Sequence, residues 1–347
     1  MVLSLCLAGC AQHQALRPPT LGELGLEVPD TRLVDTGGSE GERQGLASSV
    51  DWWRAFDDPQ LNELVERALA QSPEVRIAAL THPKQLDEHR LAVSADIARS
   101  YVELRGAQQR AERIREALGR QDQLIRLAGF RSEAQLVPSL DMVRATAERD
   151  RIAAGIPPVE ARISERLGHI AALAGDAPGA FGPNLEAVGP VPRGPDRVLD
   201  VPPAELQRRR PDLVAAARRF AKSGFLGYRP ESARIAYKRA VLSALEEARA
   251  RNAAFRQAKA REMALEKALE SARRAATLAY DDYRQGEAGY AVLEQAQGAL
   301  LSVEKSLEQA RTARACALID VFEAQGPVPV RDGQPGSRTG DAGAGNE

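Results

Sequence analysis

The sequence predicts an all-α protein built from two copies of a long helical hairpin. The helical pattern of residues 91–175 recurs in residues 241–326, at an offset of about 150 residues. Aromatic residues make up only 4% of the chain, whereas alanine, leucine, arginine, glutamate and glutamine are abundant in both copies. This composition is typical of long helices and coiled coils. No segment alternates apolar and polar residues over the length of a strand.

The two copies match at their turns and at their ends. Residues 140–145 align with residues 291–296, and each copy closes on a glycine, Gly175 in the first and Gly326 in the second. Glycine directly after a helical pattern is a common stop signal. We therefore expect two repeats of the same hairpin rather than two unrelated domains. Alanine-rich helices bury little area each, so stability depends on neighbouring helices, including those of other subunits.

The N-terminal residues resemble a bacterial lipoprotein signal. Leu7-Ala8-Gly9-Cys10 matches the lipobox, in which the cysteine is acylated and becomes the mature N-terminus. We expect residues 1–10 to be a signal remnant with Cys10 as the lipidation site, and Ala11 resembles the residue found in lipoproteins sent to the outer membrane. The alternative is an ordinary apolar N-terminus. Residues 11–50, rich in Gly, Pro, Ser and charge, are predicted to be an extended tether.

Residues 51–175 form the first predicted repeat, which includes an N-terminal helix. Asp58 suits an N-cap, with Pro59 in the first helical turn. A break at 81–85 follows the second helix, and Ile156-Pro157-Pro158 must kink or restart the chain, because each proline removes a backbone donor. The expected helices are 60–71, 73–80, 86–127, 138–155 and 156–175.

Residues 203–326 form the second predicted repeat, after a Pro- and Gly-rich loop at 176–202. A basic helix is expected at 203–220, followed by a break and by a pattern without Pro or Gly from 232 to 283. Gly286 and Gly289 mark a turn, and the last helix is expected at 290–323. Residues 327–347 have low complexity and are predicted to be disordered.

Charge and motifs exclude several classes of function. The net charge of −1 argues against a strongly basic nucleic-acid binder. No nucleophile elbow, phosphate loop or zinc motif is present, and the four histidines are scattered, so we expect neither an enzyme nor a metal or other cofactor. Trp52 and Trp53 stand together, either as a hot spot for a partner or as a packing element.

Several motifs together resemble one known family. The run from Trp52 to Leu61 reads WWRAFDDPQL, Ile156-Pro157 precedes a further helix, and Leu206 is followed by Arg209-Arg210-Pro211-Asp212. Tyr283, Arg284 and Gly286, followed by Tyr290, complete the set. These residues resemble the outer-membrane factor family of TolC- and OprM-like efflux ducts, and most closely its NodT-type lipoproteins. The Arg-Arg-Pro-Asp run is the most specific match.

The resemblance implies a fold and shows one departure. Family members form trimers, in which each protomer contributes helical hairpins to a periplasmic tube and two strand hairpins to a membrane β-barrel. Here both strand insertions are missing, because only short segments at 81–85 and 223–230 occupy their places. The membrane β-strands are therefore expected to be absent, and the chain is expected to be a periplasmic α-barrel-type protomer.

The resemblance also implies function, partners and site residues. It indicates the duct component of a tripartite, RND-type export system for drugs or solutes, a homotrimer that meets a periplasmic adaptor and an inner-membrane pump. Cys10 would anchor it to the outer membrane facing the periplasm; without acylation it would be soluble in the periplasm. The alternative is a soluble helical scaffold or adaptor-binding protein without transport.

The implied site lies at the hairpin tips. Asp141, Gly286, Tyr290 and Glu294 would form the periplasmic entrance and the adaptor contact, and the alternative for the two acidic residues is a solvated helix face. Arg209, Arg210, Pro211 and Asp212 are expected to be structural, at the equator of the tube.

Overall fold

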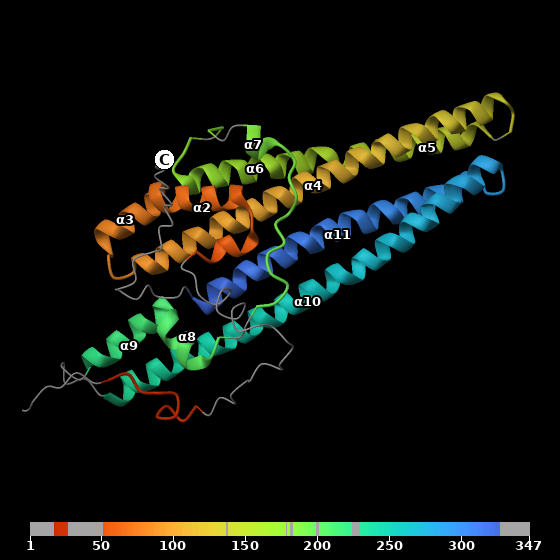
Figure 1. Ribbon diagram of the computed structural model, residues 1–347. Coiled ribbons are helices and arrows are strands. Elements are labelled where there is room, and N and C mark those ends of the chain that lie inside the picture. Colours follow the sequence, from red (N-terminus) through yellow and green to blue (C-terminus); the bar gives the residue numbers. More distant parts are fainter. Residues whose placement is uncertain are drawn as a thin grey trace, which may run out of the picture.

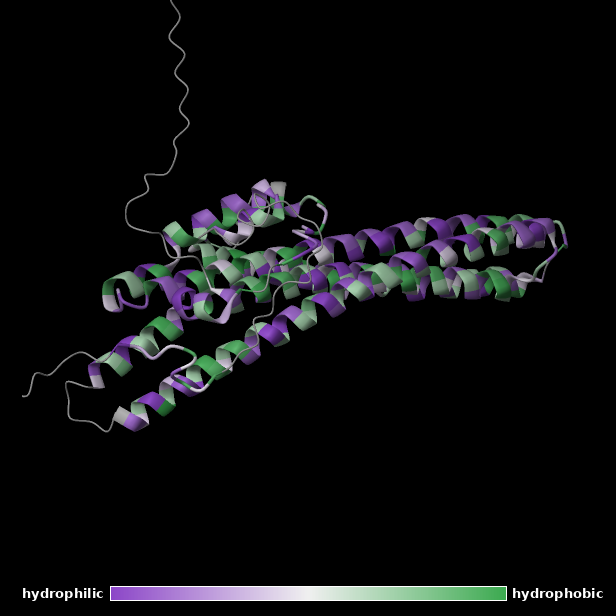
Figure 2. Cartoon of the chain, turned by 60° about the horizontal axis from the view of Figure 1, so that its bottom comes forward, coloured by the Kyte–Doolittle hydropathy of each residue, from purple (hydrophilic) through white to green (hydrophobic). Residues whose placement is uncertain are grey.

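Two long helical hairpins lie side by side in the computed structural model (Figure 1). It describes residues 17–26, 51–136, 138–177, 179–180, 183–198, 201–223 and 230–326, and no residue in these ranges belongs to a β-strand. The predicted all-α, two-repeat fold is confirmed. Figure 2 shows hydrophilic and hydrophobic residues interspersed along every long helix. Among the helices of the described ranges, none has an apolar stretch long enough to cross a membrane.

The first repeat begins with three short elements and continues into a hairpin. The 3₁₀ turn η1 is followed by α2, where the Asp58 side chain accepts a hydrogen bond from the Leu61 amide at 3.0 Å, which confirms the predicted N-cap. The outgoing arm of the hairpin is α4, about 72 Å long. The elements are η1 (Trp52–Phe56), α2 (Pro59–Gln71), α3 (Pro73–Thr81), α4 (Leu86–Glu133), α5 (Ser139–Ala153) and α6 (Ile156–Ala174).

The return arm of the first repeat is broken, as the prolines predict. α5 ends at Ala153, and α6 restarts at Ile156 with prolines in its first turn, where a missing amide proton costs nothing. The Gly155 amide donates to the Ile152 carbonyl at 3.0 Å and closes the joint. α6 then ends at Gly175, which has the positive φ of a helix-terminating glycine.

The second repeat has the same order of elements with an unbroken return arm. Its elements are α8 (Pro203–Arg209), α9 (Pro211–Ser223), α10 (Pro230–Gln285) and α11 (Tyr290–Gln325), and a short helix, α7 (Pro183–Glu186), precedes them. α10 is about 84 Å long. α11 packs along α10 and along α4, so it joins the two repeats (Figure 1).

Two predicted helix boundaries were wrong, and one short helix was not predicted. The single helix expected at 203–220 is two helices, because Pro211 forces Arg210 into an extended conformation. α4 runs to Glu133, six residues beyond the predicted end at 127, since this stretch contains no proline and a single glycine, Gly129, is not enough to end a helix. The loop expected at 176–202 contains α7.

The core follows the helix contacts and includes both tryptophans. Trp52 stacks on Phe322 with ring centroids 5.6 Å apart, and its indole Nε1–H donates to the Ser94 hydroxyl at 3.2 Å. Trp53 is buried beside it. The packing interpretation of the pair is therefore confirmed, since neither ring is available to a partner.

Each repeat has a connection between its last short helix and its first long helix, and the structure describes the one in the first repeat. Residues 82–85 make a tight turn between α3 and α4, whereas 224–229 lie outside the described residues. Residues 17–26, within the segment expected to be a tether, form turns that place Leu24 in a cluster with Leu206 and Tyr237. Cys10, the rest of the tether and the tail at 327–347 lie outside the described residues.

Candidate functional site at the hairpin tips

The two hairpin turns come together at one end of the molecule (Figure 1). In the second repeat, the Glu287 amide donates to the Asp282 carbonyl at 2.8 Å and the Gly286 amide donates to the Tyr283 carbonyl at 3.1 Å. This pair of bonds is a Schellman motif, with Gly286 at its left-handed position at φ +87°. A side chain at 286 would be strained, which explains the glycine.

Buried tyrosines connect the tips of the two repeats. Tyr283 and Tyr290 lie edge to face with ring centroids 5.9 Å apart, and both are buried. Arg131 of α4 places its guanidinium 4.7 Å from the centre of the Tyr283 ring and donates to the Tyr283 carbonyl. The tips of the two hairpins are therefore joined within one protomer.

Gln121 adds a second connection below the tip. Its side-chain amide donates to the Ala145 carbonyl of α5 at 2.8 Å and to the Tyr290 hydroxyl of α11 at 2.9 Å. Burial raises the pKa of Tyr290 to about 12; the hydrogen bond from Gln121 opposes this shift, and the nearby charges of Glu294 and Glu148 contribute to it. Tyr290 therefore stays neutral and acts as a fixed polar contact between the hairpins.

The two acidic candidates lie at different levels of the tip. Asp141, in the first turn of α5, lies near Tyr283; burial raises the pKa of this tyrosine, and the charge of Asp141 raises it further. Glu294 of α11 lies near Arg151 of α5. The pKa of Arg151 is raised, chiefly by its hydrogen bonds to Glu148 and in addition by the charge of Glu294. Both candidates are only partly exposed.

The Arg-Arg-Pro-Asp motif lies far from the tips and forms a corner between helices. Arg210 holds Asp212 through two hydrogen bonds of 3.0 and 2.9 Å, and it also donates to Glu247 of α10 and to the Ala324 carbonyl of α11. Burial acts to raise the pKa of Asp212, but the hydrogen bonds and charge of Arg210 outweigh it and lower that pKa. Arg209 pairs with Glu205 one turn earlier.

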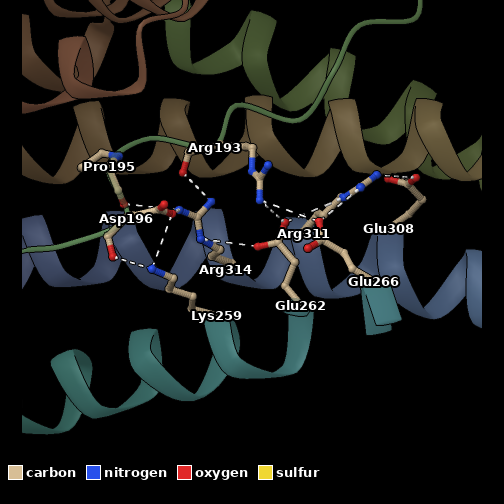
Figure 3. A network of polar contacts seen from close by, with 9 residues as sticks. All are labelled: Arg193, Pro195, Asp196, Lys259, Glu262, Glu266, Glu308, Arg311 and Arg314. Atoms are coloured by element: carbon tan, nitrogen blue, oxygen red, sulfur yellow. Dashed lines mark hydrogen bonds and ion pairs between the residues drawn. The ribbon is translucent and has the colours of Figure 1, made fainter. Parts of the chain in front are cut away.

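A segment that the sequence did not single out joins the repeats at mid-height. This strap, residues 187–198, lies between the arms of the two hairpins (Figure 3). Buried Arg314 of α11 donates to the Arg193 carbonyl at 2.9 Å and to Asp196 at 2.8 Å, and it lies 3.4 Å from buried Glu262 of α10. The partners are far apart in sequence, so no local pattern could have revealed them.

The strap is also fixed to the first repeat. Gln109 of α4 donates to the Gly189 carbonyl at 2.9 Å, and Arg105 donates to the Ala187 carbonyl at 2.6 Å. The strap therefore joins α4 to the α10–α11 hairpin. Among the described residues, no group of three metal-ligating side chains occurs.

The comparisons with solved structures agree with this architecture. The chain is similar to the Neisseria gonorrhoeae outer-membrane channel MtrE (TM-score 0.73, 17% identity, 90% of this chain and 97% of that one) and to the outer-membrane channel OprN (0.71, 21%, 86% and 98%). It is also similar to the outer-membrane protein VceC of Vibrio cholerae (0.65, 18%, 81% and 99%). No protein-family model matches the sequence, and no characterised protein matches it at the level of sequence.

These similarities define the class of fold. The helices of this chain have the arrangement found in outer-membrane channels, and the resemblance to the outer-membrane factor family is confirmed at the level of the fold.

Proposed function

We propose that the chain is the periplasmic duct body of an outer-membrane efflux system. The observation that carries this proposal is the paired helical hairpin with both tips intact and joined through Tyr283, Tyr290 and Arg131. The fold shared with MtrE and OprN, described as outer-membrane channels, supports it. The described residues are helical and contain no strand, which supports our proposal that the chain corresponds to the helical part of such a system.

The proposed assembly is a homotrimer with its hairpin tips directed towards an adaptor. Alanine-rich faces of α10, with Leu278 and Met263 exposed, need intersubunit burial. The tips of three protomers would present Asp141 and Glu294 around one axis, where converging carboxylates favour cations. A periplasmic adaptor would meet these tips and connect the duct to an inner-membrane pump of the RND type. Acylated Cys10 would anchor the assembly to the outer membrane.

Adaptor binding tests this function through the second tip. A valine at 286 is strained because β-branched residues do not adopt φ +87°, so Gly286→Val should abolish crosslinking to a purified periplasmic adaptor. The matched control is Gly289→Val, since Gly289 has negative φ and open space around its Cβ position. The proposal is supported if the unmodified chain and Gly289→Val bind the adaptor and Gly286→Val does not.

Two other outcomes would contradict it. Equal adaptor binding by all three proteins would remove the tip from the interface. Absence of binding by any of them would favour a soluble helical scaffold that takes no part in transport.

A further inference from the structure

The end of the molecule opposite the tips contains elements of both repeats (Figure 1), and several of its apolar side chains are exposed. We define the turn end as α3, the turn at 82–85, α9 and residues 231–240 of α10. Ile77 and Leu80 of α3 are 60% and 86% exposed, and Ile235 of α10 is 59% exposed. In the described part of the chain, Leu80 is the most exposed large apolar side chain. These residues cover no neighbouring helix, so the protomer alone gives them no packing role.

The turn end is also basic, whereas the tip of the second repeat is acidic. Residues 211–223 and 231–240 contain six lysines and arginines and two acidic residues, and residues 281–294 contain four acidic residues and one arginine. The whole chain has a net charge of −1. Positive charge is therefore concentrated at one end of a nearly neutral molecule, a distribution that favours an anionic partner at that end.

The basic residues of α9 are available to such a partner. Arg218, Arg219 and Lys222 are exposed on the side of α9 opposite its buried face, and none of them forms an ion pair with a described residue. Asp212, on the same helix, is already held by Arg210. On α10, Arg239 lines an open hollow of about 530 Å³ together with Ile235 and Ala236. Cationic and apolar groups thus occur side by side.

The N-terminal segment reaches the fold at this same end. Leu24 is buried against residues of α8, α9 and α10, and Arg234 of α10 donates to the Glu23 carbonyl. Cys10 precedes Arg17 by seven residues, a length of chain that spans at most about 25 Å. An acyl group on Cys10 would therefore enter the membrane close to the turn end.

We infer that the turn end docks on the surface of an anionic lipid bilayer. Exposed lysine and arginine side chains would contact phosphate headgroups, and Leu80, Ile77 and Ile235 would insert among them, the combination by which proteins lie on membrane surfaces. The long hairpins then project away from the membrane, with the acidic tip of the second repeat at the far end. This inference deepens the proposed function by naming the surface that carries the duct body, and it requires neither an adaptor nor transport.

Vesicle binding tests the inference in the full chain carrying Cys10→Ser, which removes the acyl group. Co-sedimentation is measured with phosphatidylcholine vesicles that contain or lack phosphatidylglycerol. The unmodified turn end should bind only the anionic vesicles, and added salt should weaken binding. Replacing Arg218, Arg219 and Lys222 with glutamine should weaken binding roughly a hundredfold, because each basic residue contributes about fivefold. Leu80→Ser should weaken it by roughly tenfold through lost insertion.

The matched control replaces Arg256, Arg261 and Arg273 with glutamine. These arginines are also exposed and form no ion pair with a described residue, but they lie farther along α10 towards the tip. The control should bind anionic vesicles like the parent chain, and circular dichroism verifies that both triple variants remain helical.

Three outcomes would overturn the inference: equal binding to neutral and anionic vesicles, equal losses in the two triple variants, or full binding by the α9 variant. Displacement by soluble polyphosphate together with unchanged binding of Leu80→Ser would indicate a polyanion site instead of a lipid surface. Loss of adaptor binding with intact vesicle binding would contradict only the proposed function.

Discussion

The return arms of the two hairpins occupy equivalent places but are built differently. In the first repeat the arm is broken between α5 and α6, where prolines follow Gly155. In the second repeat α11 runs through the equivalent place without a break and buries Glu304, Glu308 and Arg314. Repetition has thus preserved the path of the chain but not its interactions. The first arm contains a joint, and the second arm carries the polar connections between repeats.

The polar connections give the largest expected effect. Arg314→Met should lower the free energy of unfolding by about 3–4 kcal/mol, because the buried guanidinium donates hydrogen bonds to the Arg193 and Pro195 carbonyls and to Asp196. Glu262 would also lose one of its charged partners but would keep Arg193 at 3.2 Å. The terminal glycines of the two repeats, Gly175 and Gly326, are 151 residues apart. The same offset makes Ile163 the first-repeat counterpart of Arg314. Urea unfolding measures the change, with exposed Arg256→Gln as control. A loss below about 1 kcal/mol would show that the two arms do not differ as described.

Exchanging the residues at the joint tests the comparison directly. Gln309 is the counterpart of Pro158, so Gln309→Pro should break α11 and lower the free energy of unfolding by about 3 kcal/mol. The reverse change, Pro158→Gln, lies in the first turn of α6 and should cost less than about 1 kcal/mol. Urea unfolding of both variants provides the measurement, and equal costs would contradict the assignment of a joint to the first arm only.

The two tip turns should also respond differently. Gly286→Ala places a Cβ at φ +87° and should cost about 1–2 kcal/mol. The first tip has Gln135 at φ +58°, so Gln135→Gly should relieve strain and leave stability equal or slightly higher. Thermal unfolding followed by circular dichroism compares them. Destabilisation of similar size in both variants would argue against strain at the first tip.

The smallest expected effect concerns acid stability at the corner of the second repeat. Because the folded-state pKa of Asp212 is lowered, its contribution is complete above its unfolded pKa of about 3.9 and is lost as the pH falls through the lower, folded value. Asp212→Asn should therefore remove part of the acid dependence below about pH 4. The change should stay below about 1 kcal/mol, since the carboxylate is partly solvated. If urea unfolding shows the same loss of stability below about pH 4 in Asp212→Asn as in the parent chain, Asp212 is not its source.

The sequence predicted those parts of the fold that depend on local signals. Proline and glycine gave the joint at Ile156, the end at Gly175 and the turn at Gly286 correctly. It missed the break at Arg210, although Pro211 signalled it, because apolar periodicity continues across the break. It also missed α7, a helix of four residues that is too short to show a period.

The candidate site was only partly predictable. The motif placed Gly286 and Tyr290 at the second tip, although Tyr290 is buried there and an adaptor contact of either residue stays a prediction. Arg131 and Gln121, which connect the tips, were not identified. Their partners in the second repeat, Tyr283 and Tyr290, are more than 150 residues away in the sequence, so the contacts are visible only in the folded chain. The same holds for Arg314 and the strap. The positions of Asp141 and Glu294 around a threefold axis stay a prediction.

Sedimentation equilibrium of the full chain carrying Cys10→Ser tests the proposed duct body most directly. The proposal predicts a species of three chains of 37.4 kDa, about 112 kDa, that dissociates only on dilution. Arg314→Met should weaken this species, since it loosens the α10–α11 hairpin. A folded monomer of 37.4 kDa at every concentration would contradict the proposal that this chain builds a duct.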